Sequence, residues 1–422
     1  MLKIKTTVVL NLVFLLILSS CNIGGSSNNN APTNPVLNPL PTPSNSNLIV
    51  NITPNGREGQ LCGNINIPCV SVTICSPTNP TSCQTIDNVL IDSGSVGLRI
   101  FKSILNSSLV LPLESAGNST IANCVGYGDL SANWGPLAIA NITLSNESTT
   151  QSIPIQLIDS SYANGGSKCL NSLNNTRSSF HLESSPEEFG FNGILGVAPI
   201  IYDNITGYFS CTDSLCLDET EIIHEVTSLL MTNPIAFLPE SYGSGITFKL
   251  PTLDNNGATN VVGYAIFGVG SNNDNIFESG INIYHIYTDG SSNCNYYLFI
   301  CMPTTLLTNT TIQYGFLDTG SNFFSFNDDN ISNTDGFYTP NSMRTLYASN
   351  TSENGEVITT SFNIANIYNL FNNTNNTAFN NNGANGFDGF LDYGLPFFFG
   401  KTVYICFQDK TCNGIPGPYW AF

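Results

Sequence analysis

Two stretches of this 422-residue sequence share one pattern, and together they decide the fold: Val89-Leu90-Ile91-Asp92-Ser93-Gly94-Ser95 and Tyr314-Gly315-Phe316-Leu317-Asp318-Thr319-Gly320-Ser321. In each, an apolar run that predicts a strand ends at an aspartate, a hydroxyl residue, a glycine and a serine. The glycine lets the backbone turn back close to a neighbour, and the hydroxyl groups can hold the carboxylate by hydrogen bonds. Each stretch therefore predicts a carboxylate fixed at a strand end, one in each half of the chain.

The chemistry of such a pair follows from electrostatics. If Asp92 and Asp318 face each other at about 3 Å, both cannot ionise, so they share a proton. One carboxyl then acts as a base toward a water held between them while the other acts as an acid. This chemistry needs no metal and no cofactor. The residues expected to support the pair are Ser93, Gly94, Ser95, Thr319, Gly320 and Ser321.

The two turns resemble the paired active-site turns of pepsin-like aspartic peptidases. The segment from Phe191 to Ala198 is similar to the apolar-apolar-glycine segment that crosses behind the first turn in that family. In the second half the corresponding segment is Gly389 to Gly400, where Asp392 is expected to replace the usual glycine. The resemblance implies a mainly β, bilobal double barrel with a central cleft, and an endopeptidase that cleaves extended peptides.

Further stretches resemble a bacterial family of pepsin-like lipoproteins of unassigned function. They are residues 84–101, 264–270, 391–404 and 417–422. Pepsin-like peptidases also cover their cleft with a hairpin that carries a tyrosine, which makes Tyr127 the flap candidate; an aromatic residue on an ordinary hairpin is the alternative. Arg99 stands where that family usually has the tryptophan that anchors the flap tyrosine. An arginine pointing inward there would depress the pKa of the aspartate pair.

From residue 51 onward, short runs rich in Ile, Val, Phe, Tyr and Thr alternate with Asn, Gly, Ser and Pro, which predicts a mainly β body. We expect a first lobe over residues 51–258 and a second lobe over residues 259–422. One segment, Glu219 to Met231, has apolar residues at helical spacing and predicts an amphipathic helix. The expected strands are Val70–Cys75, Asn88–Asp92, Ala138–Leu144, Ile153–Ile158, Gly245–Leu250, Tyr264–Val269 and Gly315–Asp318.

The N-terminus resembles a lipoprotein signal. Lys3 and Lys5 precede an apolar run that ends at Leu18-Ser19-Ser20-Cys21, too short for a plain membrane anchor. We expect residues 1–20 to be a signal peptide, Cys21 to carry the lipid, and residues 21–50 to form a disordered tether. The alternative is a secretory peptide with an incidental cysteine. The chain is thus expected in the bacterial cell envelope, anchored by lipid to the outer membrane.

The other twelve cysteines permit six disulfides in an oxidising compartment. Zinc is disfavoured, because there is no Cys-x-x-Cys pair and the only three histidines lie far apart in the sequence. The net charge of -19 disfavours binding to nucleic acid. Proximity along the chain suggests the pairs Cys62–Cys69, Cys75–Cys83, Cys211–Cys216, Cys294–Cys301 and Cys406–Cys412, which leaves Cys124 with Cys169.

Two functions of different classes follow. The first is an aspartic endopeptidase, expected to be monomeric, in which Asp92 and Asp318 activate a water. The second is a catalytically silent binding protein that holds a peptide or glycan in the same cleft, since fold does not certify function. A purely structural envelope lipoprotein fits the paired turns less well. A Ser-His-Asp hydrolase is disfavoured because no Gly-x-Ser-x-Gly elbow is present.

Overall fold

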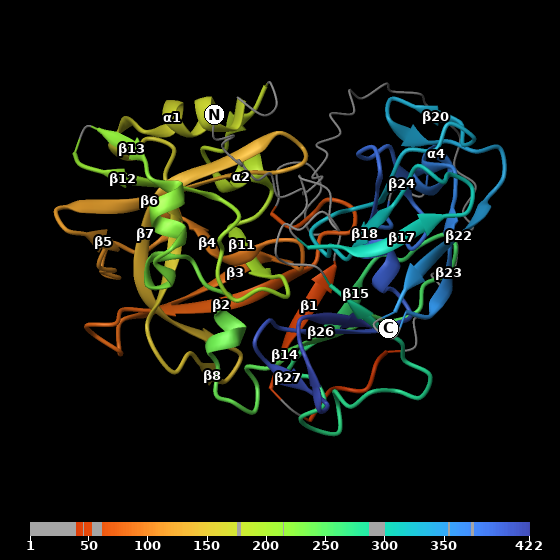
Figure 1. Cartoon of the computed structure of the whole chain (residues 1–422), viewed down its shortest axis with the longest axis horizontal. Helices are drawn as coiled ribbons and strands as arrows, with labels where there is room; N and C mark the ends of the chain where they lie inside the picture. Colours follow the sequence, from red (N-terminus) through yellow and green to blue (C-terminus); the bar gives the residue numbers. More distant parts are fainter. Residues whose placement is uncertain are drawn as a thin grey trace, which may run out of the picture.

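The computed structural model describes residues 39–44, 46–52, 61–174, 179–213, 215–286, 300–352, 355–372 and 375–422. These residues form a mainly β protein with four short α-helices (Figure 1). The strands before residue 258 are β1 Asn47–Ile52, β2 Cys69–Cys75, β3 Cys83–Asp92, β4 Val96–Phe101, β5 Ser115–Ala116, β6 Ser119–Gly126, β7 Ser131–Leu144, β8 Glu147–Ser148, β9 Ile153–Ile158, β10 His181–Leu182, β11 Gly193–Val197, β12 Gly207–Cys211, β13 Cys216–Asp218 and β14 Gly245–Lys249.

The remaining strands follow residue 258. They are β15 Val261–Phe267, β16 Ile283–His285, β17 Met302–Leu306, β18 Tyr314–Phe316, β19 Phe324–Ser325, β20 Asn333–Thr334, β21 Phe337–Tyr338, β22 Arg344–Thr351, β23 Val357–Ile364, β24 Gly383–Ala384, β25 Phe390–Tyr393, β26 Thr402–Cys406, β27 Thr411–Cys412, β28 Ile415–Pro416 and β29 Tyr419–Ala421. All seven strands expected from the sequence are present, although β3 and β7 begin well before the expected Asn88 and Ala138. Runs rich in Val and Ile form them because β-branched side chains pack well on a pleated surface.

The first half contains a closed barrel. Strand β2 pairs with β3, β3 with β11, β11 with β4, β4 with β9 and β9 with β7, and β7 returns to β2. Closure leaves these six strands without free edges. The second half builds a nine-stranded sheet around β18, β25 and β19 that forms half of a barrel. In Figure 1 the barrel lies on the left and the half-barrel on the right.

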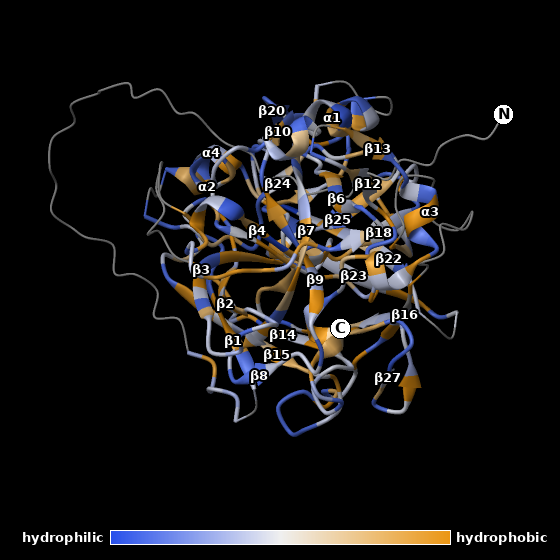
Figure 2. Cartoon of the chain, turned by 90° about the vertical axis from the view of Figure 1, so that its left-hand side faces the viewer, coloured by the Kyte–Doolittle hydropathy of each residue, from blue (hydrophilic) through white to orange (hydrophobic). Residues whose placement is uncertain are grey.

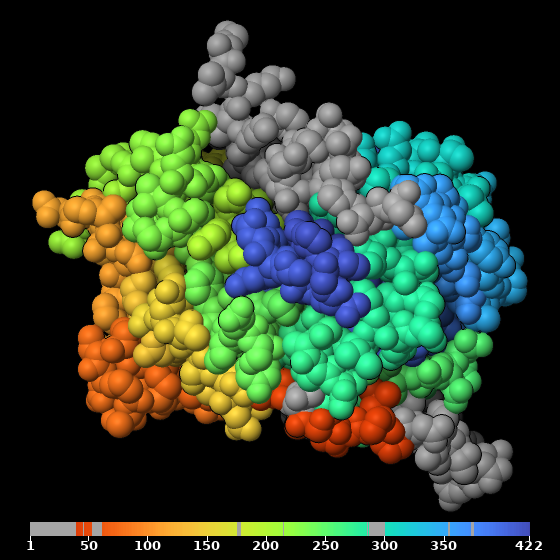
Figure 3. Space-filling model, turned by 60° about the horizontal axis from the view of Figure 1, so that its bottom comes forward, coloured from red at the N-terminus to blue at the C-terminus, as the bar shows by residue number. Residues whose placement is uncertain are grey.

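A shared sheet joins the two halves. Strands β1, β15, β14, β26, β29 and β16 follow one another in antiparallel register, and they come from both ends and from the middle of the chain. The boundary expected at residue 258 thus falls between β14 and β15, which are neighbours in one sheet. Figure 3 shows the C-terminal segment, in blue, at the centre of one face, with green segments from the middle of the chain on both sides.

One apolar core runs through both halves. Val72 and Ile142 of the barrel belong to the same buried cluster as Phe316, Phe397 and Trp420. Figure 2 shows apolar residues concentrated in the strands near the middle of the molecule, whereas the peripheral loops are mainly hydrophilic. A continuous core of this kind holds the strand ends of the two halves at fixed positions.

The helix expected over Glu219–Met231 is wrong in length. The α-helix α3 covers only Thr220–His224, and a separate 3-10 turn covers Thr227–Leu229. Ile222 is 66% exposed, so the expected apolar face does not form. Short helices rich in β-branched residues are marginal, and local packing decides their ends. The other helices are α1 Gly166–Asn174, α2 Pro186–Phe189 and α4 Ile367–Phe371.

Five of the six expected disulfides are confirmed. They are Cys62–Cys69, Cys75–Cys83, Cys124–Cys169, Cys211–Cys216 and Cys406–Cys412. The sixth pair involves Cys294, which lies outside the described residues, as do the expected signal peptide, Cys21 and most of the tether. The tether prediction was wrong at its end, because residues from Asn47 onward form strand β1, which pairs with β15. No helix among the described residues is long and apolar enough to cross a membrane.

Candidate active site

The turn at Asp92 is placed by three strands. Strand β11 runs parallel to β3, with Gly196 opposite Asp92, and antiparallel to β4. A Cβ atom at position 196 would lie 2.6 Å from the carbonyl carbon of Ser95, so only glycine allows this close approach. The crossing segment expected behind the first turn is therefore present.

The turn at Asp318 repeats this arrangement. Strand β25 runs parallel to β18 and antiparallel to β19, and Asp392 lies opposite Phe316. A Cβ atom at Gly394 would lie 2.6 Å from the carbonyl oxygen of Ser321, which occupies the same place in its turn as Ser95. Gly394 is thus the counterpart of Gly196. The expectation that Asp392 replaces this glycine was wrong by two residues, because the sequence alone does not fix the strand register.

The counterpart of Asp392 in the first half is an apolar residue, Ile194. Ile194 lies opposite Leu90, two residues before Asp92, as Asp392 lies opposite Phe316, two residues before Asp318. On the other side, Ile194 faces Arg99 of β4 and Asp392 faces Ser325 of β19. The second half therefore carries a carboxyl where the first half carries a hydrocarbon side chain.

Each aspartate is held by its own turn in the same way. The backbone N–H of Gly94 donates to Asp92 Oδ1 at 2.7 Å, and the hydroxyl of Ser95 donates to Asp92 Oδ2. In the second turn, Gly320 N donates to Asp318 Oδ1 at 2.8 Å and Ser321 Oγ donates to Asp318 Oδ2 at 2.9 Å. These hydrogen bonds fix both carboxyl groups at the strand ends, as the sequence pattern predicts.

Two hydroxyl groups lock the turns to each other. Ser93 Oγ donates to Leu317 O at 3.0 Å and accepts from Thr319 N at 2.9 Å. Reciprocally, Thr319 Oγ1 donates to Ile91 O at 2.8 Å and accepts from Ser93 N at 2.9 Å. All four bonds are buried. The arrangement has approximate two-fold symmetry and brings together segments that are distant in the sequence.

The two carboxyl groups meet in the centre of this arrangement. The carboxyl groups of Asp92 and Asp318 lie within hydrogen-bonding range of each other, and both are fully buried. A Cβ position built on Gly320 lies 2.8 Å from Asp92 Oδ1 and 3.1 Å from Asp318 Oδ1. Burial, followed by the nearby Asp92 and Asp392 carboxyls, raises the pKa of Asp318 well above its ordinary value. A proton is therefore retained on the pair to higher pH than on an isolated aspartate.

Asp392 is a third carboxyl in this region. It is 1% exposed, and neither of its oxygens has a hydrogen-bond partner. Burial is the main cause that raises the pKa of Asp392 well above its ordinary value, and Asp92 adds to the rise. The nearby Ser321 hydroxyl opposes this effect, but it donates its hydrogen to Asp318. The sequence analysis placed Asp392 in the segment behind the second turn, but two residues from its actual position opposite Phe316.

Tyr127 lies on the expected hairpin, formed by β6 and β7. Its side chain is 1% exposed, and its hydroxyl accepts a hydrogen bond from Asn133 Nδ2 at 2.9 Å. The ring packs against Phe189 with centroids 5.8 Å apart. Burial raises the pKa of Tyr127, and the Asp92 carboxylate adds to the rise.

Arg99 points into the protein, but its charge has its own partner. Its guanidinium pairs with Asp203 at 2.6 Å and donates to Val96 O at 2.7 Å, and the ion pair is fully buried. The expected depression of the pKa of the aspartate pair by an inward arginine is not seen at Asp318, where the shift is upward.

The loop closed by the Cys62–Cys69 disulfide ties the first half to the second beside the pair. Asn66, at its tip, is fully buried and donates to Asn322 O and to Phe379 O, both at 2.9 Å. It also accepts from Phe379 N at 2.8 Å. Asn322 lies four residues after Asp318, so this contact borders the second turn. The Asn-rich sequence gave no signal for it.

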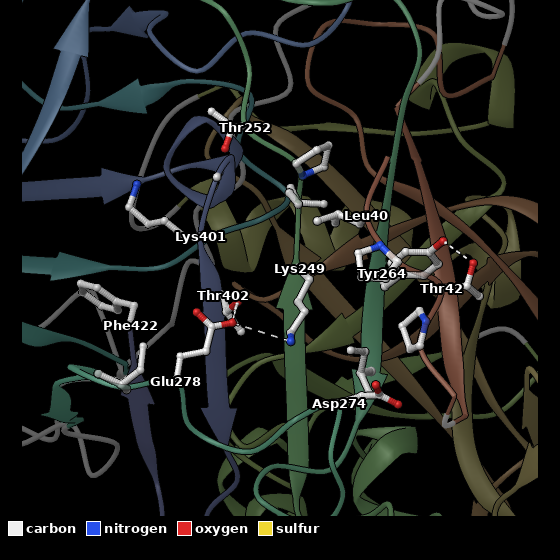
Figure 4. Close-up of a pocket in the computed structure, with 17 residues that line it drawn as sticks. Leu40, Thr42, Lys249, Thr252, Tyr264, Asp274, Glu278, Lys401, Thr402 and Phe422 are labelled. Atoms are coloured by element: carbon white, nitrogen blue, oxygen red, sulfur yellow. Dashed lines mark hydrogen bonds and ion pairs between the residues drawn. The ribbon is translucent and has the colours of Figure 1, made fainter. Parts of the chain in front are cut away.

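A separate cavity of about 510 Å³ lies on the shared sheet and contains neither aspartate of the pair (Figure 4). Its charged groups are satisfied locally: Lys249 lies 3.7 Å from Glu278, and Lys401 donates to Phe397 O at 2.8 Å. Burial lowers the pKa of Lys401 to about 8. No cluster of three or more potential metal ligands occurs in the part of the chain that the structure describes.

Comparison with known proteins gives a family and no function. No curated protein matches the chain. A family described as "Protein of unknown function (DUF3443)" matches residues 43–422, which include both aspartate turns, the hairpin with Tyr127 and Asp392. Since this match covers most of the sequence, the chain belongs to that family.

Proposed function

We propose that this protein is an aspartic endopeptidase with a bilobal, pepsin-like fold, in which a water activated between Asp92 and Asp318 hydrolyses peptide bonds. The observation that carries the proposal is the reciprocal pair of turns. Two buried carboxyl groups lie within hydrogen-bonding range of each other, and each is held by the glycine N–H and serine hydroxyl of its own turn. Enzymes arrange paired carboxyls in this way when one must act as an acid and the other as a base.

The proposed reaction keeps the protons balanced. The ionised carboxyl takes a proton from the water as its oxygen attacks the scissile carbonyl carbon, and the protonated carboxyl donates its proton to the carbonyl oxygen. Collapse of the tetrahedral intermediate breaks the C–N bond. The nitrogen leaves with a proton from the pair, and the pair recovers one from the intermediate's hydroxyl. The pair begins and ends the cycle with one proton between its two members.

The substrate of this reaction is an extended peptide. Such a peptide would lie beside the β6–β7 hairpin as an added strand, with main-chain hydrogen bonds giving affinity and side pockets giving preference for bulky apolar residues. The hairpin tyrosine, Tyr127, would close over the substrate. A lipid at Cys21 would anchor the monomeric enzyme in the cell envelope, at the outer membrane, with protein substrates within reach of the tether.

The test is cleavage of a mixed peptide library by the chain without residues 1–38, from about pH 3 to 8. Asp92→Asn and Asp318→Asn should each abolish cleavage, and statine-type inhibitors should block it. Asp328→Asn is the matched control, because Asp328 is another buried aspartate of the second half and lies outside the site. Cleavage that persists in either dyad variant would assign the activity to a different site or to a contaminant.

A second candidate function is a silent protein that binds a peptide or glycan in the same cleft. The observations that favour it are the full burial of both aspartates and the Asn66 contacts that join the halves beside them. This candidate predicts peptide or glycan binding without turnover. Its binding should be unchanged in Asp92→Asn, because an asparagine preserves the shape of the site.

A further inference from the structure

Asp392 is a buried carboxyl group of which neither oxygen has a hydrogen-bond partner. It is 1% exposed. Among the described residues, no ion pair includes it. An ionised carboxylate in such a place would carry the desolvation penalty of an unpaired buried charge. The group therefore keeps its proton to higher pH than an isolated aspartate does.

The surroundings of Asp392 consist of other carboxyls and uncharged groups. Strand β18 places Phe316 beside it and strand β19 places Ser325 beside it. The turns at the ends of β3 and β18 bring Asp92 and Asp318, and both interact with it electrostatically. The buried cation of the first half, Arg99, is paired with Asp203. No group in this set favours ionisation of Asp392 except the Ser321 hydroxyl.

We propose that Asp392 is a third member of the aspartate pair's proton-sharing unit, and that it extends the working range of Asp92 and Asp318 toward higher pH. In a site of three interacting carboxyls, each ionisation makes the next one harder, and the protons leave in steps that belong to the group as a whole. At a given pH the three carboxyls hold more protons than two would. The singly protonated state of the pair, which the reaction needs, then persists to higher pH.

Asp392 acts here as a positioning residue, through charge, and it does not touch the substrate. Its effect on cleavage rests on the proposed peptidase function. The proposal that Asp392 shares protons with the pair is independent of the peptidase function. Proton sharing and cleavage are therefore measured separately.

Infrared spectroscopy detects the carbonyl absorption of protonated carboxyl groups and therefore measures proton sharing. The absorption is followed in solutions of increasing pH, with the chain without residues 1–38. Asp392→Asn should remove one such group near neutral pH, and the remaining absorption should disappear at lower pH than in the parent. In Asp318→Asn the Asp392 absorption should also titrate at lower pH. The control Asp328→Asn should leave the titration of both groups unchanged. If Asp392→Asn does not move the titration of the remaining carboxyls, the proposal is wrong.

The effect on catalysis is measured as the pH profile of kcat/KM for peptide cleavage. In Asp392→Asn, the pH at which activity is lost on the alkaline side should fall by about one unit, which is a tenfold change in proton concentration. Asp392→Leu restores the apolar character of Ile194 and should show the same shift, which separates the charge from the shape of asparagine. A profile that does not move in either variant overturns the catalytic part. A parent protein that cleaves nothing refutes the peptidase proposal, and the infrared titration still decides proton sharing.

Discussion

The two halves of this protein build the same turn and place different ionisable groups behind it. In the first half, Ile194 lies opposite Arg99, whose positive charge is matched by Asp203. In the second half, the equivalent positions hold Asp392 and Ser325, and the carboxyl has no partner. The backbone of the turn and its hydroxyl and glycine positions agree between the halves, whereas the layer directly behind it does not.

The difference shows at which positions the backbone of the turn requires one residue type and at which positions several types are allowed. A glycine is needed at 196 and at 394 because a Cβ atom would collide with the turn, and a hydroxyl is needed at 93 and at 319 to satisfy buried backbone groups across the interface. The residue at 194 or 392 has no such constraint. Charge could therefore change in this layer while the pair of turns was kept.

The largest effect is expected from removing Asp203, the carboxylate that pairs with Arg99 in the first half. Asp203→Ala leaves the fully buried Arg99 without compensation and should lower the free energy of unfolding by about 3–5 kcal/mol. Urea unfolding measures it. The double variant Arg99→Met with Asp203→Leu should lose less, because no charge is left buried. Lys102→Ala, which breaks the exposed pair with Asp159, should cost at most about 1 kcal/mol. A similarly small loss in Asp203→Ala would show that Arg99 finds other compensation.

The symmetry of the turns is tested by the two hydroxyl residues that cross between them. Ser93→Ala and Thr319→Ala each remove one buried donor and one acceptor, and each should cost about 1–3 kcal/mol of unfolding free energy. The double variant should cost less than the sum, because both residues belong to one network. Ser71→Ala, which removes an exposed hydroxyl bonded to Asp87, is the control and should have little effect. A large difference between the two single variants would contradict the two-fold arrangement.

The buried carboxyl group of Asp392 should make the free energy of unfolding depend on pH. The pKa of Asp392 is raised in the folded state, so the unfolded chain releases its proton at lower pH than the folded chain does. Stability is thus lost as pH rises from about 4, the unfolded value, toward the folded value, by at most about 1.4 kcal/mol per pH unit. Asp392→Leu should remove this loss and stabilise the protein at neutral pH. Unfolding by urea at several pH values measures the slope, and an unchanged slope in the variant would mean that Asp392 is ionised in the folded protein.

The sequence contained the turns and the barrel but not the contacts between distant segments. Apolar runs ending at Asp92 and Asp318 predicted both strand ends, and short spacing between cysteines predicted four of the five confirmed disulfides, with Cys124–Cys169 left by elimination. The partner of Arg99 could not be predicted, because Asp203 is distant in the sequence and carries no motif. The contacts of Asn66 could not be predicted either, since asparagine is common throughout the chain. The position of Asp392 was missed because register depends on pairing that only the folded sheet specifies.

The smallest expected effect concerns the hairpins, where the halves differ again. The first-half hairpin, β6–β7, has Asp129 at its tip, and Glu183 beside it donates its backbone N–H to Ala132 O. Burial raises the pKa of Glu183 to about 7, with Asp129 contributing, and burial raises the pKa of Asp129 to about 6. Both carboxyls therefore ionise in the folded protein between pH 6 and 7, and their repulsion should loosen the tip as pH rises through that range.

Hydrogen exchange, corrected for the intrinsic pH dependence, should show protection of the tip falling by about two- to tenfold from pH 5 to pH 8. Glu183→Gln should remove most of this change. The β22–β23 hairpin of the second half is the internal control, and an equal loss of protection there would assign the effect to the whole fold and not to the acidic tip.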